Sequence, residues 1–426
     1  MVTSDDRCSE ENRPRSGLNR REFLPFLGAA SLVTVAPRAL AAAPSRGSHS
    51  DDDERAEDRF VYVGTYTAPG IAPGGHVPST AVGIYVFRMN GDDGGLTPIE
   101  VVTTDNPSFL ALDPSLTHLY STNENGADGH NVPLGRVSAY AIDKRSGTLS
   151  LLNTALTNGT FPAHLSVHPS GKYLLGSNYG TGNFPIYRIL ADGSIGARTD
   201  DFHDAGNGTG PNPDRQEGPH AHQILTDLDA RHVFGVDLGA DKVMAWNLDL
   251  DTGRLSPNTV PSAPVASGSG CRHMAFHQSR EFAYVLDELV SSITAFHYDP
   301  TRGAFIWLQT ISTLPAGFTG FNTTAEIRIH PNGHFLYNTN RGHNSVAMFR
   351  IDPDTGRLNV IGWESTRGDW PRGMNIDPSG TFLYAANQNS DTIVIFRIDR
   401  SNGTLHATGE VVHTPTPVDV EFGPQA

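Results

Sequence analysis

The strongest constraint on the fold of this 426-residue chain is a sequence repeat with a period of about 50 residues. Each copy contains an alternating apolar pattern, a turn and a second alternating pattern. Six copies begin at Phe109, His164, His222, His273, Glu326 and Gly373. A repeat of this length is typical of propeller blades, because each blade needs its neighbours to bury its apolar surface.

Each copy has the pattern of four short strands. The first strand ends at a turn such as Asp377-Pro378-Ser379-Gly380, and the second strand ends in Asn or Asp. A third strand, such as the one over residues 345–352, leads into a glycine turn and a weaker fourth strand. Since no helical period appears, we predict an all-β fold built from four-stranded blades.

The two ends of the chain supply a seventh blade. Residues 59–67 match the second strand of a repeat, residues 82–89 match the third, and residues 417–424 match a first strand with no second strand after it. We therefore predict a seven-bladed β-propeller over residues 59–426. N- and C-terminal strands in one blade would close the ring and remove exposed sheet edges.

The N-terminal segment resembles an export signal. Arg20 and Arg21 precede an apolar run over residues 26–35 and a small-residue site at residues 39–41. We predict a twin-arginine-type signal over residues 1–41, and hence a periplasmic or extracellular protein. The alternative is a disordered basic tail before a short buried helix. The run is too short for a permanent membrane span.

Residues 42–58 are rich in acidic side chains and are predicted to form a disordered linker. The formal net charge of −15 argues against nucleic acid as a partner. Cys8 lies within the predicted signal, so Cys271 is the single thiol of the mature chain and no intramolecular disulfide is expected. Nucleotide-binding glycine motifs and a Gly-x-Ser-x-Gly elbow are absent from the sequence, so we predict no cofactor. A closed ring is compatible with a monomer.

In a propeller, the starts of the innermost first strands and the ends of the second strands meet at one mouth of the central channel. Charged and histidine side chains gather at these positions. The starts carry His164, His220, His222, Arg272, His273, Glu326 and Arg372, and the ends carry Glu124, Tyr179, Asp237, Asp287, Glu288, Arg341 and Gln388. The sequence therefore predicts a site at this mouth.

Most histidines are poor candidates for chemistry. His168, His277 and His330 occupy the repeat position of Asp113 and Asp377, just before the hairpin turn, where a short polar side chain caps the backbone. We predict that these three histidines are turn residues.

The segment Gly-Pro-His-Ala-His differs, because its His220 and His222 have no counterpart in other repeats. We favour acid–base or substrate-contact roles for this pair. The alternatives are a structural pair, or a zinc site completed by His273 and Asp237; no metal is predicted.

Arg272 and Arg341 introduce positive charge at the mouth, where a guanidinium can bind a carboxylate or phosphate with two hydrogen bonds. The alternative is a salt bridge between blades. Glu288 can pair with Arg272, which would lower its pKa, and still act as a general base. For Glu326 and Asp237, a structural ion pair is as good an interpretation as substrate contact.

Several stretches resemble the seven-bladed propeller lactonase family, which includes 6-phosphogluconolactonase-like enzymes and is related to carboxy-muconate cyclase. These stretches are YVGTYT, NPSFLALDP, GPHAH, GCRHMAFH with DEL, LQTISTLP, AEIRIHPNGHFLYNTNRGHNS, PRGMNIDPSG and ANQNSD. The likeness covers residues from Phe60 to Phe422. One departure is Cys271, at a position where the family usually has proline.

The resemblance implies metal-independent hydrolysis of a small sugar-type lactone. It implies catalytic roles for His222, Glu288 and Arg272, and substrate contacts through His220 and Arg341. The mouth position alone adds further expected substrate contacts, which are His273, Glu326, Asp237 and Arg372. Two other functions remain open from the sequence: a non-catalytic exported propeller that binds carbohydrate or protein, and a muconate cyclase-type lactonising enzyme.

Overall fold

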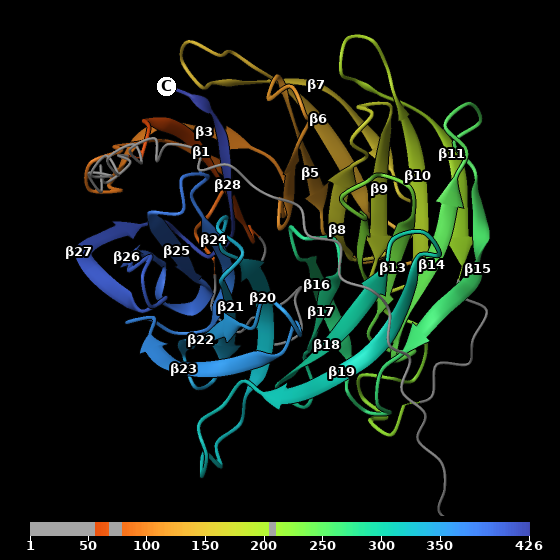
Figure 1. The fold of residues 1–426 in the computed structure, drawn as a ribbon. Helices are drawn as coiled ribbons and strands as arrows, with labels where there is room; N and C mark the ends of the chain where they lie inside the picture. Colours follow the sequence, from red (N-terminus) through yellow and green to blue (C-terminus); the bar gives the residue numbers. More distant parts are fainter. Residues whose placement is uncertain (1–55, 68–78, 204–209) are drawn as a thin grey trace, which may run out of the picture. The chain divides into compact units, whose positions relative to one another are not determined.

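The computed structural model describes residues 56–67, 79–203 and 210–426. In these residues the strands form seven four-stranded antiparallel sheets arranged as the blades of a propeller (Figure 1). This confirms the predicted fold class. The predicted export signal and residues 42–55 of the predicted linker lie outside the described residues.

Blade 1 comprises β28, β1, β2 and β3, and blades 2 to 7 follow in chain order, each with four consecutive strands. The first strands of blades 1 to 7 are β28 (Pro417–Gln425), β4 (Leu110–Leu112), β8 (Pro162–Val167), β12 (Ala221–Thr226), β16 (Cys271–Phe276), β20 (Thr323–Ile329) and β24 (Pro371–Ile376). The second strands are β1 (Arg59–Thr65), β5 (His118–Asn123), β9 (Tyr173–Asn178), β13 (Val233–Asp237), β17 (Phe282–Asp287), β21 (Phe335–Arg341) and β25 (Phe382–Asn387).

The third and fourth strands extend each blade outward. The third strands are β2 (Gly83–Met89), β6 (Arg136–Ile142), β10 (Asn183–Ile189), β14 (Lys242–Leu248), β18 (Ser292–Asp299), β22 (Ser345–Ile351) and β26 (Thr392–Ile398). The fourth strands are β3 (Leu96–Thr103), β7 (Leu149–Leu156), β11 (Ile195–His203), β15 (Leu255–Pro264), β19 (Ala304–Ser312), β23 (Leu358–Ser365) and β27 (Leu405–His413). A short 3-10 helix, η1 (Gln388–Ser390), follows β25.

The ring closes as predicted, because β28 from the C-terminus pairs antiparallel with β1 from the N-terminal part of the chain (Figure 1). Packing also reaches into the end of the predicted linker. Ala56 is buried in the core of blade 1, and the Asp58 carboxylate accepts a hydrogen bond from the Gly91 backbone at 3.0 Å. The packed unit therefore includes at least residues 56–58 in addition to the predicted 59–426.

The apolar core lies between the blades. Each of the seven large clusters of buried residues combines side chains from two neighbouring blades; one, for example, joins Phe335 and Met348 of blade 6 to Leu383 and Phe396 of blade 7. The clusters thus bury the faces that a single blade would leave exposed, which explains why the repeat must be complete around the ring.

A repeated tyrosine adds a hydrogen bond to this packing. In six blades a buried second-strand tyrosine donates its hydroxyl proton to a backbone carbonyl in the turn between the third and fourth strands of the next blade. These tyrosines are Tyr62, Tyr120, Tyr173, Tyr284, Tyr337 and Tyr384. Each such bond contributes about 1 kcal/mol to stability.

The three predicted turn histidines have that role. The Nδ1 atoms of His277 and His330 each accept a hydrogen bond at 3.1 Å from the backbone N–H two residues later, and His168 does the same with Ser170.

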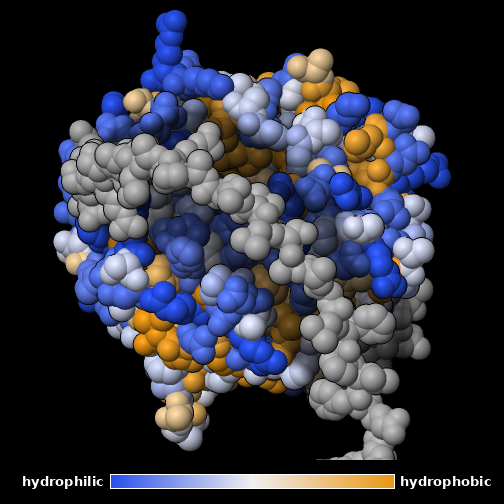
Figure 2. All heavy atoms as spheres, viewed as in Figure 1, coloured by the Kyte–Doolittle hydropathy of each residue, from blue (hydrophilic) through white to orange (hydrophobic). Residues whose placement is uncertain are grey.

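Figure 2 shows one face of the propeller, where hydrophilic residues gather around the centre and hydrophobic residues form separate patches.

A β-bulge near the start of the first strand recurs in at least five blades, including blade 6, where it falls between Thr324 and Ile327 of β20. In β12, Ala221 pairs with Asp237 and Gln223 pairs with Val236, so His222 is an extra residue in the ladder. The same shift occurs at Arg272 in β16, at Arg372 in β24 and at Ala163 in β8. A bulge redirects the side chain of the extra residue, and here the extra residues lie at the channel mouth.

Candidate active site

The mouth of the channel holds a small cavity of about 20 Å³, which we call the mouth cavity. Its lining combines the bulge residues of first strands, residues at the ends of second strands and one loop residue. The lining residues are Glu124, Ala163, Tyr179, Arg215, His222, Glu288, Arg341 and Arg372. The hairpin geometry inferred from the sequence thus places residues from several blades around one space.

Glu288 directly follows β17 and is surrounded by three guanidinium groups. Its Oε1 atom lies 2.9 Å from Nη2 of Arg215 and 3.1 Å from Nη2 of Arg341. Its Oε2 atom lies 3.1 Å from Nε of Arg272. Arg272 and Glu288 therefore form the ion pair predicted across the β16–β17 hairpin. Arg215, from a loop, forms a second ion pair with Glu288.

Burial and charge act in opposite directions on the Glu288 carboxylate. Burial alone would raise its pKa, but Arg341, Arg215 and Arg272 outweigh burial and hold the pKa well below its usual value. Burial, with Arg372 and Arg341 nearby, lowers the pKa of Arg272 to about 9, so this group still carries its charge at neutral pH. Glu288 therefore serves as the counter-ion that allows the arginines to approach one another.

A second carboxylate stands on the opposite wall. Glu124 accepts hydrogen bonds from the hydroxyl groups of Tyr66, at 2.7 Å, and Ser108. Nη2 of Arg372 lies 3.9 Å from the Glu124 carboxylate, and its guanidinium covers the Tyr66 ring at 5.2 Å. The four arginines around the cavity face two carboxylates, which leaves an excess of two formal positive charges for a bound anion.

His222 is the basic side chain best placed to exchange a proton in the mouth cavity. Its ring lines the cavity, and its buried Nδ1 atom has no hydrogen-bond partner in the described structure. Burial, together with Arg272 and His273, lowers its pKa well below the usual value. His222 is therefore a neutral imidazole at pH 7, which can accept a proton.

Arg215 was not among the residues that the sequence placed at the mouth, and Tyr179 was placed there without an assigned role. Arg215 lies in the long loop between β11 and β12, which has no counterpart in other blades, and its Nε atom donates to the Tyr179 hydroxyl at 3.1 Å. Tyr179 follows β9, and its ring contacts His222 edge-on at 5.6 Å. The signal for Arg215 was a charged residue inside the same insertion that carries His220 and His222.

His220 and Asp237 lie beside the cavity and do not line it. The His220 ring stacks on Tyr179 at 4.5 Å, and its Nδ1 atom bonds the Tyr179 carbonyl at 2.9 Å. Asp237 accepts hydrogen bonds from the backbone N–H groups of His220 and Ala240. In this structure the two residues shape the loops that hold Tyr179 and His222.

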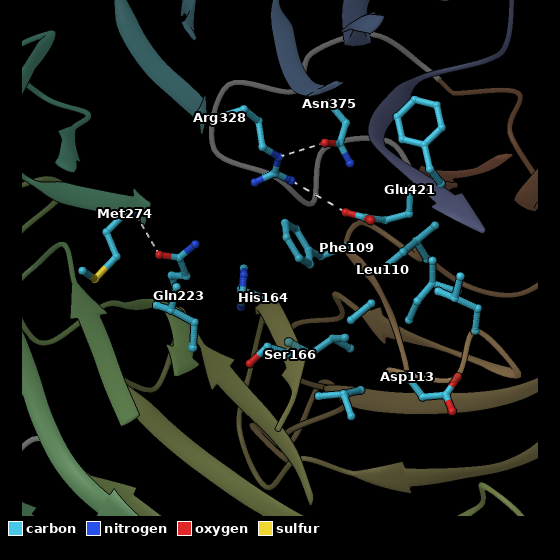
Figure 3. A pocket seen from close by; sticks show the side chains of 17 residues that line it. Phe109, Leu110, Asp113, His164, Ser166, Gln223, Met274, Arg328, Asn375 and Glu421 are labelled. Carbon is cyan, nitrogen blue, oxygen red and sulfur yellow. Dashed lines mark hydrogen bonds and ion pairs between the residues drawn. The ribbon is translucent and has the colours of Figure 1, made fainter. Parts of the chain in front are cut away.

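A second cavity of about 530 Å³ occupies the other end of the channel (Figure 3). We call it the channel chamber. The polar and charged side chains that line it come from the first strands and the β4–β5 turn. They are Asp113, His164, Ser166, Gln223, Arg328, Asn375 and Glu421.

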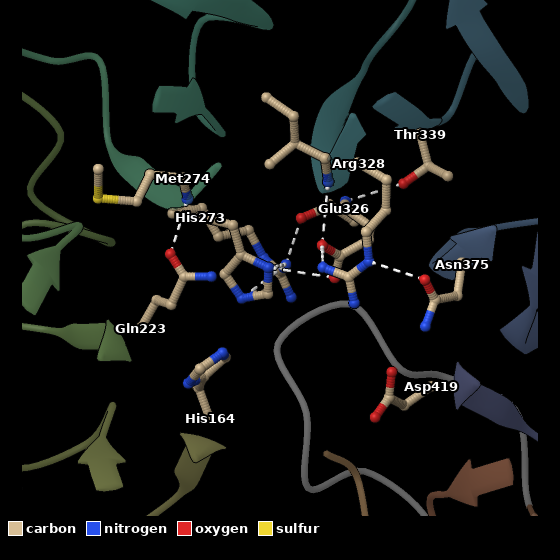
Figure 4. Close-up of polar contacts among 12 residues, drawn as sticks. His164, Gln223, His273, Met274, Glu326, Arg328, Thr339, Asn375 and Asp419 are labelled. Carbon is tan, nitrogen blue, oxygen red and sulfur yellow. Dashed lines mark hydrogen bonds and ion pairs between the residues drawn. The ribbon is translucent and has the colours of Figure 1, made fainter. Parts of the chain in front are cut away.

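His273 and Glu326 lie between the two cavities. Nδ1 of His273 lies 3.1 Å from Oε2 of Glu326, whose Oε1 atom accepts a hydrogen bond from Nη1 of Arg328 at 2.7 Å (Figure 4). Both ring nitrogens of His273 lie 3.3 Å from Nη1 of Arg272, which also donates to the Ala325 carbonyl. His273 and Glu326 thus support Arg272 from behind the mouth cavity.

The Cys271 thiol lies away from the mouth cavity. Its side chain is buried in the core shared by blades 4 and 5, with the sulfur 3.1 Å from the Asp237 carbonyl. Burial, together with Asp287, Asp237 and Asp241, raises the pKa of the thiol well above its usual value. A buried thiol of this kind behaves as a small apolar side chain.

Within residues 56–67, 79–203 and 210–426, no group of three or more His, Cys, Asp or Glu side chains has an arrangement that could hold a metal ion. The same residues contain no helix that is long and apolar enough to cross a membrane.

Comparison with known proteins identifies the family. The family described as "Lactonase, 7-bladed beta-propeller" matches residues 60–422. This chain belongs to the seven-bladed β-propeller lactonase family. The match spans all seven blades and both strands that close the ring, so the resemblance noted in the sequence is confirmed.

Relatives within this lactonase family include enzymes named 6-phosphogluconolactonase. One from Bacillus subtilis is 36% identical over 73% of this chain and 83% of its own length, and one from Formosa agariphila is 34% identical over 74% and 86%. A solved structure of a periplasmic gluconolactonase from Pseudomonas aeruginosa is 31% identical, with a TM-score of 0.79 over 87% of this chain and 100% of that chain.

Proposed function

We propose that this chain is a metal-independent hydrolase that opens a sugar-type lactone at the channel mouth, with the reacting carbonyl against the mouth cavity. The observation that carries the proposal is the neutral imidazole of His222 beside a carboxylate held by three arginines. Membership of the lactonase family and the names of its relatives support the same reaction class.

In the proposed reaction, His222 accepts a proton from a water molecule that attacks the lactone carbonyl carbon. A tetrahedral intermediate with a negative oxygen then forms. When the ring C–O bond breaks, the proton held by His222 passes to the leaving ring oxygen. The product is an open hydroxy acid that ionises in solution, and the imidazole returns to its neutral form.

Arginines supply the electrostatic part of this proposal. Arg272 and Arg341 are fixed by Glu288 and by backbone carbonyls, so their charges are oriented before the substrate arrives. Positioned donors of this kind stabilise a developing oxyanion without needing to reorganise during the reaction. The arginines hold the pKa of Glu288 well below its usual value, so in this proposal the carboxylate acts mainly through the arginines.

The excess positive charge favours a lactone that also carries an acidic group. A substrate carboxylate or phosphate would lie near Arg215 and Arg372, while Arg341 faces the carbonyl. Arg272 does not line the cavity and acts through its ion pair with Glu288. The remaining predicted contacts then act indirectly: His273 and Glu326 position Arg272, and His220 positions Tyr179.

We also propose that the chain is exported from the cytoplasm. The twin-arginine-type pattern in residues 1–41 supports export to the periplasm or the extracellular space. The similarity to a periplasmic gluconolactonase is consistent with that compartment.

A pH-stat assay tests the reaction class. Acid release from gluconolactone and from 6-phosphogluconolactone would be measured with and without a chelator, and the spontaneous rate subtracted. We expect enzyme-dependent acid release that the chelator does not change. Absence of turnover with both lactones would favour a binding protein, and lactone formation from a muconate would favour a cyclase.

The pH dependence of kcat/KM reports the state of His222. A base whose pKa is depressed is active at every pH above that depressed value. We therefore expect a plateau that extends from pH 8 to well below the usual histidine value of about 6.5. A fall in kcat/KM with an apparent pKa near 6.5 or higher would argue against His222 as the base.

A further inference from the structure

The channel chamber is separate from the mouth cavity. It extends to the turn between β4 and β5, because Asp113 and Leu116 are among its lining residues. Between the two cavities lies the ring of His273, whose centroid is 5.1 Å from that of His222 on the mouth side and 5.5 Å from that of His164 on the chamber side. A molecule bound in the chamber therefore does not occupy the proposed active site.

Two mostly buried side chains of the chamber each have a polar atom without a protein partner. Gln223 is 4% exposed, and its Oε1 atom accepts a hydrogen bond from the Met274 backbone at 2.7 Å, but its Nε2 atom has no partner among the described residues. His164 is 5% exposed, and only its Nδ1 atom is bonded, to the Ile224 N–H at 3.4 Å. Unpaired polar atoms of residues that line a cavity are available to hydrogen-bond a ligand or ordered water.

The chamber offers both hydrogen-bond donors and acceptors. Figure 3 shows Gln223, His164, Arg328 and Glu421 around one central space, from four different first strands. Phe109 supplies an apolar surface beside His164, with ring centroids 4.2 Å apart. The volume of about 530 Å³ lies within the range common for small-molecule sites.

Among its described lining residues, the chamber presents no unpaired arginine or lysine to an anion. Arg328 is already paired with Glu326 at 2.7 Å, and it lies 3.7 Å from Glu421. Glu421 and Asp113 face the chamber, and Asp419 is buried behind it (Figure 4). Burial raises the pKa of Asp419 well above its usual value and the pKa of Glu421 to about 7, so neither carboxyl group is fully ionised at neutral pH, and the one arginine of the lining is already paired.

We propose that the channel chamber is a second small-molecule site, which binds a neutral polyhydroxy compound of about hexose size. Each hydroxyl group of such a compound can donate and accept, which matches the mixed lining of Gln223, His164, Arg328 and Glu421. Sugar acids carry a negative charge for which the chamber has no unpaired arginine, whereas the mouth cavity has an excess of arginines. This proposal does not depend on the hydrolysis proposed for the mouth cavity.

Ligand-observed NMR with the full chain tests the proposal, with glucose and sorbitol as neutral probes and gluconate as the anionic probe. We expect saturable binding of both neutral probes that excess gluconate does not displace. Gln223→Leu is expected to weaken neutral-probe binding by at least about five-fold, because it removes the unpaired amide donor. Arg341→Met, in the mouth cavity, is the matched control and should leave neutral-probe binding unchanged.

The proposal can still be tested if Gln223→Leu does not fold. Ser166→Phe fills the chamber from another strand and should abolish neutral-probe binding, and the gluconate competition needs no variant. Absence of saturable binding of the neutral probes would overturn the proposal. Displacement of these probes by gluconate, or their loss in Arg341→Met, would place them in the mouth cavity and overturn it equally.

Discussion

Replacing His222 with asparagine is expected to lower kcat for lactone hydrolysis by about 10²- to 10⁴-fold, the usual contribution of a positioned general base. Asparagine keeps a polar side chain at the β12 bulge but cannot take up the proton from water. The rate would be measured by acid release in a pH-stat, with the spontaneous hydrolysis of the lactone subtracted.

His277→Asp is the matched control for this substitution. His277 occupies a hairpin-turn position that is aspartate in other repeats, and it lies outside the mouth cavity. Its replacement should leave kcat unchanged. If His222→Asn keeps kcat within about three-fold of the unmodified chain while the fold is retained, His222 is not the base.

Glu288→Gln is expected to lower the free energy of unfolding by about 3–5 kcal/mol at pH 7, because it leaves the buried Arg272 and Arg341, and the partly exposed Arg215, without their counter-ion. The depressed pKa means that this stabilisation is fully present above the ordinary carboxylate pKa and is lost only as the pH falls through the folded value. Urea unfolding at pH 7 therefore measures the full effect, and kcat should fall with it.

Two further variants make the Glu288 result specific. Glu364→Gln removes the partner of Arg367 in an exposed ion pair at 2.8 Å, and should change the free energy of unfolding by less than about 1 kcal/mol. Arg215→Gln added to Glu288→Gln removes one uncompensated cation and should recover part of the lost stability. A Glu288→Gln variant as stable as the unmodified chain would show that the arginines do not require this carboxylate.

The sequence was sufficient to predict the blades and the ring closure. A repeated hairpin has fixed geometry, so the start of one strand and the end of the next must meet at one end of the sheet. From this geometry we expected Arg272 to lie beside Glu288, with both residues near His222 and Arg341. The structure has this arrangement. It also separated the turn histidines from the histidines at the mouth.

The bulges could not be predicted from alternation alone. A strict period of two gives no sign that Arg272 is an extra residue in the β16 ladder, which turns its side chain to the mouth and leaves His273 behind it. The same limitation explains why Glu326 was expected to contact substrate, whereas it bonds His273 and Arg328.

The position of Arg215 could not be predicted from the repeat, because its contacts occur in one blade only. It lies in a loop present in one blade, and its place is fixed by the Tyr179 hydroxyl and the Glu288 carboxylate, which are 36 and 73 residues away in the sequence. Long-range contacts of a unique loop leave no periodic signal. Only the clustering of charged residues near His220 pointed to it.

A crystal structure with the bound sugar-acid product tests the central claim most directly. If the mouth cavity opens a sugar-type lactone, the product carboxylate should lie within hydrogen-bond distance of Arg341, with His222 close to the hydroxyl formed from the ring oxygen. A product bound in the channel chamber or on the outer strands, with the mouth cavity empty, would contradict the assignment of the site.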